Sequence, residues 1–375
     1  MARTYTGPIY DGDGHVLENK EAIIARMPSD LQASRAVDRM RRRNVFPELD
    51  NYHNLLSISP EGSFSNPEEV RGWTRFMDEL SIGGAVLYPT DALAVGRMVD
   101  LDQIEMATMA YNDWMHQEYL KKDNRLQAVA LLPMQEPELA AQELRRAVED
   151  LGMCGGMLPA SGLRGHLGAK LYWPVYEEAE RLGCCLSVHG GSYPDLGFSD
   201  LNIFAAIHAM GHPFGIMISF MSMLFNGIFD RFPNVRYGFM EGGVAWFLMA
   251  LERGDGSYKS FRPLDPNGRF LQLRDGEEVR DHVLRHVREG RIFVGVEGDE
   301  PDLAHAVRTV GSDPFIWSSD FPHEVTVETC ALEIRELVEN EDVPDAALEA
   351  ILWKNAARMY GLRSPAGVLG ERVVS

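Results

Sequence analysis

Five stretches of the sequence end in side chains that bind metal ions or transfer protons. Each is a short apolar or glycine-rich run, and the runs end as Asp13-Gly14-His15, Val188-His189, Met240-Glu241, Val296-Glu297 and Ser319-Asp320. A buried acid must be paired, hydrogen-bonded or bound to a cation. A helix cap or a hydrogen-bonded core histidine explains any one of these residues alone. Two imidazoles and two carboxylates together suit a divalent metal such as zinc, with one position left open for water.

The first of these stretches, residues 9–16, reads Ile-Tyr-Asp-Gly-Asp-Gly-His-Val. Asp11, Asp13 and His15 occupy alternate positions, so in a strand all three polar side chains point to one face. Two acids and a histidine opposite glycines make a poor surface strand. We therefore interpret the stretch as a strand that carries metal ligands rather than as a glycine-rich turn.

Three further histidines lie where they could contribute to such a site. His208 and His212 are four residues apart, so on a helix they share one face, although Pro213 predicts a turn just after His212. His323 follows Asp320 by three residues and is predicted to orient that carboxylate, the alternative being a helix cap. Glu297 is predicted to support the site or contact the substrate. The other histidines are expected at the surface: His53, His116, His166, His282, His286 and His305.

Apolar strands alternate with amphipathic helices along most of the chain, which predicts a parallel sheet covered by helices. Eight strands are expected, at residues 9–16, 84–89, 126–133, 154–159, 185–189, 235–241, 292–297 and 315–319. Helices are expected at 101–122, 136–151, 171–182, 203–229 with a break near Gly211-His212-Pro213, 244–253, 299–310, 325–339 and 344–360. Eight such units favour a closed (β/α)8 TIM-type barrel, in which the active site lies at the carboxyl ends of the strands.

One stretch, residues 17–73, interrupts this alternation. A helix is expected to start at Ser29-Asp30-Leu31-Gln32 and to run into the basic cluster Arg39, Arg41, Arg42 and Arg43, and a proline- and asparagine-rich segment follows it. So long a connection in a compact protein is usually functional. We therefore expect one barrel domain, residues 1–375, whose insertion forms a cap or pocket wall. The arginines are expected to be a solvated helix face unless one of them meets an acidic substrate.

The composition restricts the class of partner. With 36 basic and 56 acidic residues the net charge is −20, which argues against nucleic-acid and anionic-membrane binding and favours a small-molecule substrate. There is no apolar signal region and no run of about 18 apolar residues, so a cytoplasmic enzyme is expected. The four cysteines are expected to be free core thiols. Trp246, Phe247 and Met249 fit a homodimer interface or core packing equally well.

The motifs resemble those of the amidohydrolase superfamily over most of the chain, in the branch named for amino-carboxymuconate-semialdehyde decarboxylase. They are Asp-Gly-Asp-Gly-His-Val, Ser-Val-His-Gly-Gly, the segment from His-Pro-Phe to Phe-Asp-Arg-Phe-Pro-Asn, Met-Glu-Gly-Gly and Ser-Ser-Asp-Phe-Pro-His. The family usually has His-x-His on the first strand, where this chain has Asp13 and His15. The resemblance implies the metal ligands Asp13, His15, His189 and Asp320. Binuclear members have a carboxylated lysine ending the fourth strand, which here ends Leu-Pro-Ala, so one metal is implied, zinc or else manganese.

The resemblance leaves the reaction open, because several decarboxylases of the branch have a catalytic histidine where this chain has Glu241. Our leading expectation is hydrolysis of a C–N or C–C bond next to a carbonyl by a metal-activated water. Asp320 would accept the proton of the water, and Glu241 or His212 would protonate the leaving group. The alternative is non-oxidative decarboxylation of an aromatic or unsaturated carboxylic acid. A third hypothesis, a catalytically silent binding barrel, predicts no stoichiometric metal.

Overall fold

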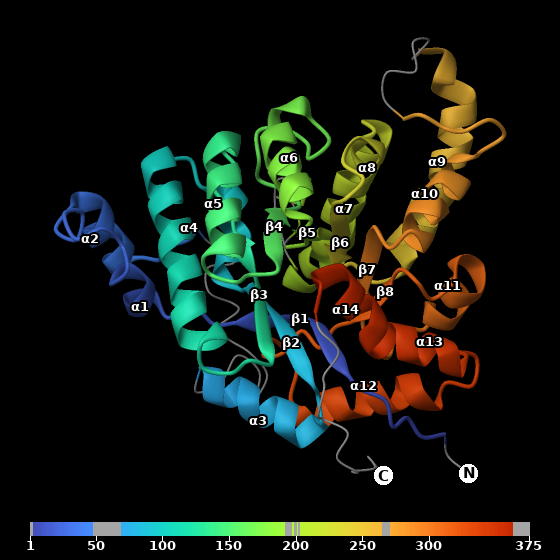
Figure 1. The fold of residues 1–375 in the computed structure, drawn as a ribbon, viewed down its shortest axis with the longest axis horizontal. Coiled ribbons are helices and arrows are strands. Elements are labelled where there is room, and N and C mark those ends of the chain that lie inside the picture. Colours follow the sequence, from blue (N-terminus) through green and yellow to red (C-terminus); the bar gives the residue numbers. More distant parts are fainter. Residues whose placement is uncertain are drawn as a thin grey trace.

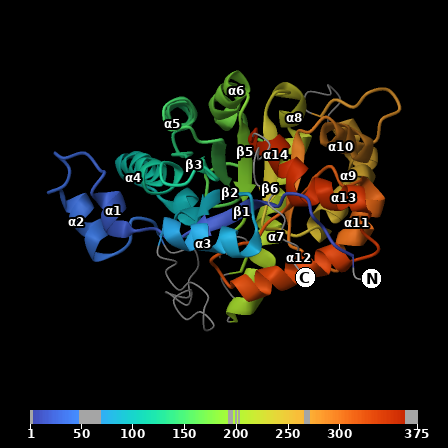
Figure 2. The same ribbon diagram turned by 60° about the horizontal axis from the view of Figure 1, so that its bottom comes forward.

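The computed structural model describes residues 3–47, 69–191, 197–198, 201, 203–264 and 271–362. Within them, eight parallel strands pair in chain order from β1 to β8. In Figures 1 and 2 these strands lie inside a ring of helices. The strands are β1 Tyr10–Val16, β2 Gly84–Pro89, β3 Leu126–Leu131, β4 Gly155–Pro159, β5 Cys185–His189, β6 Arg236–Met240, β7 Ile292–Val296 and β8 Phe315–Trp317. The predicted eight-stranded α/β barrel is confirmed.

The segment that follows β8 joins the two ends of the sheet. The backbone N–H of His15 donates to the carbonyl of Phe321 at 2.7 Å, and that of Asp320 donates to the carbonyl of Asp13 at 3.1 Å. Asp11 on β1 accepts hydrogen bonds from both the backbone N–H and the hydroxyl of Ser319. The barrel is therefore nearly closed, and its joint lies beside the predicted metal ligands.

The helices follow the strands as expected, with limits that differ by a few residues. The strands are buried along nearly their whole length because their apolar side chains face either the barrel interior or the helices. The helices of the barrel are α4 Leu101–Met115, α5 Pro137–Glu149, α6 Trp173–Leu182, α7 Phe204–Phe225, α8 Ile228–Arg231, α9 Ala245–Phe261, α10 Val279–Arg288, α11 Leu303–Val310, α12 Val327–Glu339, α13 Asp345–Glu349 and α14 Asn355–Tyr360.

The predicted break in the helix around His212 is wrong. Helix α7 is continuous from Phe204 to Phe225 with Pro213 inside it. A proline lacks the N–H that would bond the carbonyl four residues earlier, so the helix loses one internal hydrogen bond. The helix continues because it packs against β5, β6 and α9 over much of its length. By length and composition alone the helix could cross a membrane, but half of its most apolar 18-residue stretch is buried inside the protein.

The insertion after β1 contains α1 Lys20–Ile24, α2 Arg35–Arg42 and α3 Val70–Leu80. Helix α2 begins after its N-cap Ser34 rather than at Ser29, and its arginines are exposed, as expected for a solvated face. Helices α1 and α2 project from the barrel beside α4 (Figure 1). Most of the proline-rich segment lies outside the described residues, so its role as a cap stays a prediction.

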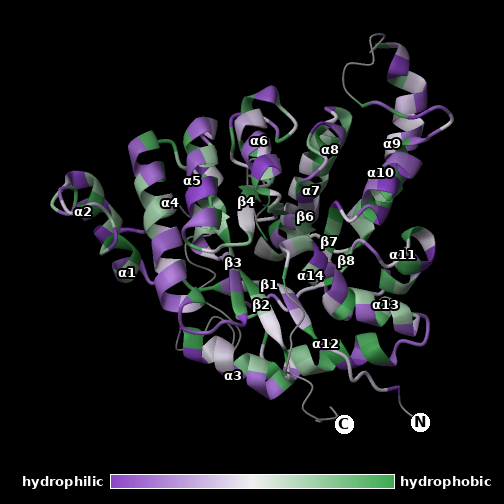
Figure 3. Cartoon of the chain, in the orientation of Figure 1, coloured by the Kyte–Doolittle hydropathy of each residue, from purple (hydrophilic) through white to green (hydrophobic). Residues whose placement is uncertain are grey.

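The sequence left open whether some apolar side chains form an interface or pack in the core, and most of them belong to the core. Trp246 and Phe247 are buried, whereas Met249 is exposed. All four cysteines are free, and only Cys154 is not fully buried. Figure 3 shows hydrophilic residues concentrated on the outer helices and loops. The core explanation therefore holds for Trp246 and Phe247.

The glycines of β1 give a test of this packing. A Cβ at Gly14 would collide with the ring of the buried Trp73, whose indole N–H donates to the carbonyl of His15 at 2.9 Å. We expect Gly14→Ala to lower the free energy of unfolding by about 1–3 kcal/mol through overpacking. The control Gly256→Ala, at an exposed helical position with no atom near the added Cβ, should raise it by about 0.5–1 kcal/mol. Urea denaturation measures both, and equal effects would contradict the packing argument.

Candidate metal centre

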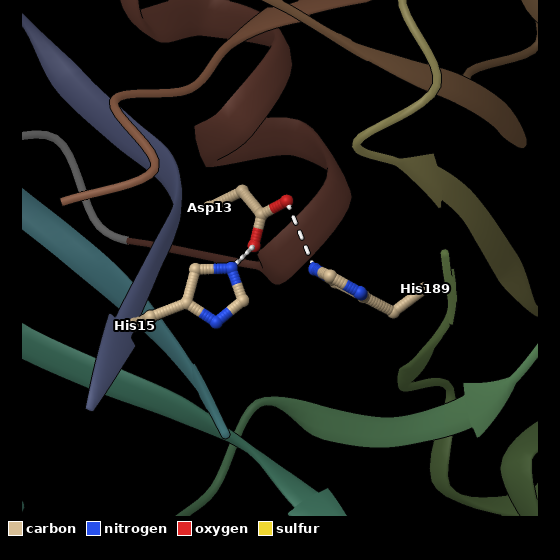
Figure 4. A group of neighbouring side chains, drawn as sticks. All are labelled: Asp13, His15 and His189. Carbon is tan, nitrogen blue, oxygen red and sulfur yellow. Dashed lines mark ion pairs between the residues drawn. The ribbon is translucent and has the colours of Figure 1, made fainter. Parts of the chain in front are cut away.

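The four predicted ligands converge at the carboxyl ends of β1, β5 and β8. The Nε2 atom of His15 lies 3.2 Å from Asp320 Oδ1 and 3.7 Å from Asp13 Oδ1. The Nε2 atom of His189 lies 3.4 Å from Asp13 Oδ2. Figure 4 shows the carboxylate of Asp13 between the two imidazoles. Strands far apart in sequence thus bring their terminal side chains to one point at the mouth of the barrel.

Backbone carbonyls fix which ring nitrogens face this point. The Nδ1 atom of His15 lies 2.7 Å from the carbonyl oxygen of Pro89, and that of His189 lies 2.9 Å from the carbonyl oxygen of Gly190. Because a carbonyl only accepts, each Nδ1 must carry the hydrogen and donate it. In the neutral rings each Nε2 then has a lone pair, which is the form in which histidine binds a metal.

The inward-facing atoms of this centre lack hydrogen-bond partners among the described residues. They are Asp13 Oδ1, His15 Nε2 and His189 Nε2. Burial raises the pKa of Asp13 to about 6, and the carboxylates of Glu241 and Asp320 add repulsion. Buried, unpaired acceptors and crowded carboxylates are unfavourable unless a cation neutralises them. The donor set therefore fits one divalent metal ion.

Asp320 is held from two sides. Its backbone has φ of 56°, in the left-handed region that few non-glycine residues adopt. Its Oδ1 lies 2.7 Å from Nδ1 of His323, whose ring stacks on that of His15 with centroids 4.1 Å apart. The Nε2 atom of His323 is in turn 2.8 Å from the hydroxyl of Thr90. The structure thus brings His323 where the sequence predicted it, in contact with Asp320.

A second group lies directly beside the ligands. Glu241, with φ of 59°, has Oε2 at 3.3 Å from Nε2 of His189 and Oε1 at 3.1 Å from Nδ1 of His212. Burial alone would raise the pKa of Glu241, but His212 and His189 outweigh it and hold that pKa well below its usual range. The exposed ring of His208 lies 4.9 Å from that of His212, one turn away on α7. His208 and His212 therefore share one face of α7, as their four-residue spacing predicted, although the helix is unbroken.

Glu297 lies farther out, at the rim, with an exposed side chain. Its neighbour Glu300 carries the structural contacts that the sequence did not reveal. Glu300 accepts hydrogen bonds from the backbone N–H of Glu297 at 2.8 Å and of Val244 at 2.7 Å, so it ties the loops after β6 and β7 together. Glu18 does the same after β2, where it accepts from the N–H groups of Thr90, Asp91 and Ala92. An acid in a loop gives no sequence signal of which backbone it will bind.

The surface prediction for His282 and His286 is wrong, because both are fully buried on α10. Their Nε2 atoms lie 3.2 and 3.3 Å from the carboxylate of Asp230 on α8. The arrangement resembles a metal site. However, Arg285 and Arg291 each donate to an Nδ1 atom of these rings. The two Nε2 atoms also lie 3.1 Å from each other, and the guanidinium groups bring positive charge against the rings, which disfavours a cation. We therefore interpret this cluster as an ion-pair network within the protein.

Comparison with known protein families shows the family to which the chain belongs. The family described as Amidohydrolase matches residues 62–362. The chain belongs to the amidohydrolase family. The match begins after β1, so Asp13 and His15 lie outside it. The other two predicted ligands, His189 and Asp320, lie inside it, as does Glu241 between them.

Curated relatives within the family are decarboxylases. The chain is 24% identical over 301 residues to gamma-resorcylate decarboxylase of Polaromonas sp., which covers 77% of this chain and 86% of the relative. It is 30% identical over 197 residues to 2-amino-3-carboxymuconate-6-semialdehyde decarboxylase of Dictyostelium discoideum, which covers 50% of this chain and 54% of the relative. The second match thus spans about half of each protein.

Solved structures share the fold. A 5-carboxyvanillate decarboxylase from Novosphingobium aromaticivorans, complexed with manganese and 4-hydroxy-3-methoxy-5-nitrobenzoic acid, has a TM-score of 0.72 at 16% identity and covers 96% of this amidohydrolase and 99% of that chain. A dihydroxybenzoic acid decarboxylase from Polaromonas sp. with bound manganese and 2-nitroresorcinol has a TM-score of 0.63 at 20% identity and covers 96% and 98%. At these identities the likeness supports the barrel fold alone.

The metal centre predicts a stoichiometry. Elemental analysis of purified protein should find about one divalent metal per chain, and Asp13→Ala and Asp320→Ala should each lose most of it because each removes a buried acceptor. The control Asp230→Asn removes the carboxylate of the other cluster and should retain the metal, because two guanidinium groups against those rings disfavour a cation there. Two metals per chain, or a loss only in the control, would contradict the assignment.

The buried Asp230 network predicts acid sensitivity. Burial lowers the pKa of His286, and the two imidazoles hold the pKa of Asp230 below its usual range although burial alone would raise it. As the pH falls below about 6.5 and then below about 4, the unfolded chain takes up these protons before the folded chain does, so stability is lost. Facing charges are Glu277, Glu289, Arg285 and Arg291.

In the test of this sensitivity, Asp230→Asn should be less stable than the unsubstituted protein at pH 7, and the difference should shrink near pH 3. Denaturant unfolding over this pH range measures it. The control Asp342→Asn, at an exposed position, should stay within about 0.5 kcal/mol throughout. A difference that grows on acidification would refute the assigned protonation of the network.

Proposed function

We propose that this amidohydrolase is a metal-dependent non-oxidative decarboxylase of a small aromatic or unsaturated carboxylic acid. The similarity to gamma-resorcylate decarboxylase along 77% of the chain carries the proposal. The second decarboxylase relative and the decarboxylases of the same fold support it. The comparisons support this alternative better than hydrolysis, our leading expectation from the sequence.

The ligand set suits the substrate class. Asp13, His15, His189 and Asp320 would hold the metal, which when bound supplies Lewis-acid stabilisation of negative charge on substrate oxygens. Manganese is a good first choice because carboxylate ligands and bound manganese in structures of this fold both favour it, although the imidazoles also suit zinc. The remaining steps fall to side chains around this centre.

Decarboxylation requires a proton but no water. As CO2 leaves, the electron pair of the broken C–C bond stays on the substrate carbon, and a proton must then form the new C–H bond. Glu241 and His212 are the groups we assign to hold and deliver this proton, because Glu241 lies 3.3 Å from His189 and 3.1 Å from His212. His208, exposed one helical turn away, would connect the pair with solvent.

Asp320 has a different task in decarboxylation than in hydrolysis. Without water to activate, it would serve as a ligand whose orientation His323 maintains through the 2.7 Å contact. Glu297 at the rim would contribute to the mouth of the pocket. The homodimer, the cytoplasmic location and the pocket-wall role of residues 17–73 stay predictions.

The reaction separates the hypotheses in one assay. Manganese-loaded protein incubated with hydroxybenzoic acids should release CO2 in amounts equal to the phenol formed, and in D2O the phenol should carry deuterium at the carbon that lost the carboxyl group. We expect Glu241→Gln to lower kcat by about 10²–10⁴-fold with the metal retained, because the carboxylate that holds His212 for proton transfer is removed. The control His305→Gln, at an exposed position on α11, should leave kcat unchanged.

Other outcomes would support the other hypotheses. Turnover of amides or esters with consumption of water and no CO2 release would favour hydrolysis. A protein that binds no metal and converts neither class of substrate would favour the silent binding barrel.

A further inference from the structure

A chain of three buried hydroxyl groups lies beneath the metal centre. Ser187 on β5 is hydrogen-bonded to Tyr88 on β2, whose hydroxyl lies 2.8 Å from that of Tyr360 on α14. The hydroxyl of Tyr360 lies 2.6 Å from the carbonyl oxygen of Gly12 on β1. The ring of Tyr88 also packs near His189, with centroids 5.2 Å apart. The hydrogen-bonded chain thus connects four elements of the barrel, β5, β2, α14 and β1, close to the predicted ligand His189.

The direction of these hydrogen bonds is determined by the carbonyl at one end. The carbonyl oxygen of Gly12 can only accept, so the hydroxyl of Tyr360 must donate to it. The hydroxyl of Tyr88 must then donate to that of Tyr360, and the hydroxyl of Ser187 must donate to that of Tyr88. Burial raises the pKa of both tyrosine hydroxyls well above their usual range, so both keep their hydrogens. Tyr360 is the terminal donor of the chain.

The carbonyl that Tyr360 binds belongs to an irregularity in β1. The pairing of β1 with β2 shifts register between Asp11 and Gly14, so Gly12 and Asp13 have no partner residue in β2. Backbone groups released from a ladder need other partners. Asp320 donates its N–H to the carbonyl of Asp13 at 3.1 Å, and the N–H of Asp13 donates to the carboxylate of Asp11 at 3.2 Å.

Tyr360 completes this set of contacts. Gly12 packs so closely on Ile316 of β8 that no side chain fits there, so the irregular segment is confined on that side by packing and at its carbonyl by the tyrosine. Helix α14 itself contacts β1, β6 and β8, and Arg236 at the start of β6 donates to the carbonyl of Met359 at 2.5 Å. The tyrosine therefore extends from a helix anchored at the amino ends of the strands to the backbone that carries Asp13.

We propose that Tyr360 is a positioning residue for the metal centre. Its hydroxyl fixes the peptide between Gly12 and Asp13, and so aims the carboxylate of Asp13 at the point faced by His15 and His189. The inference rests on the proposed metal centre and adds to it a support from the carboxyl-terminal helix. Removing a support behind a metal ligand typically weakens metal affinity about ten- to a hundred-fold.

The test compares two substitutions that each delete one buried hydroxyl. Tyr360→Phe keeps the ring and removes the donor to Gly12. Tyr237→Phe is the control, because the hydroxyl of Tyr237 on β6 is buried without a hydrogen-bond partner among the described residues. Manganese binding to metal-depleted protein is followed by the loss of the free-ion electron paramagnetic resonance signal, and the spectrum of the bound ion reports its ligand symmetry.

We expect Tyr360→Phe to weaken manganese binding by about ten- to a hundred-fold and to change the bound-ion spectrum, with no change in Tyr237→Phe. Equal affinity and identical spectra in Tyr360→Phe and the unsubstituted protein would overturn the positioning role while leaving the proposed function intact. Absence of binding to the unsubstituted protein would instead overturn the metal centre itself. If Tyr360→Phe does not fold, Tyr360→Met replaces it, because it also removes the donor to Gly12 while filling the space with a flexible side chain, and undiminished affinity there overturns the proposal.

Discussion

The crowding of buried acids at the mouth of the barrel is the constraint on which the rest of this structure depends. Asp13, Glu241 and Asp320 lie within one small volume, and each raises the energy of the others' charged forms. Such a cluster is stable only if positive charge lies among or between the acids. Between His15 and His189 a bound metal cation would supply that charge, with the Nε2 lone pairs of both imidazoles directed at the ion. His212 and His323 satisfy the acids from the outer side.

The backbone shows the same constraint. Glu241 directly follows β6, and Asp320 lies three residues after β8. Both adopt positive φ, a conformation that costs on the order of 1–3 kcal/mol for non-glycine residues and persists only where the surroundings enforce it. Around Asp320 the surroundings are the hydrogen bonds that close β8 onto β1. Barrel closure and ligand placement are therefore achieved by the same contacts, and neither can be altered without affecting the other.

The sequence revealed the parts of this arrangement that depend on local pattern. Buried parallel strands are continuous apolar runs, and their ends were marked by His189, Glu241 and Asp320, so both the barrel and the meeting of these side chains were predictable. Contacts made across the fold carry no such pattern. Tyr360 and Glu300 both fell within expected helices, at 344–360 and 299–310, and the helical pattern does not show what either side chain contacts. The buried histidines of α10 were misassigned because a polar helix face becomes an interior when Asp230 of α8, Arg285 of the same helix and Arg291 after it cover that face.

The replacement of a histidine by Glu241 at the end of β6 changes how this site can handle a proton. In the resemblance to the branch, that strand end supplies a catalytic imidazole, whereas here the strand supplies a carboxylate and the imidazole comes from α7. The Glu241–His212 contact keeps an acid–imidazole pair at the same end of the barrel. Because His212 is placed by an unbroken helix, Pro213 must be accommodated inside α7 rather than end it. The unexpected continuity of α7 thus brings His212 into contact with Glu241 at the end of β6.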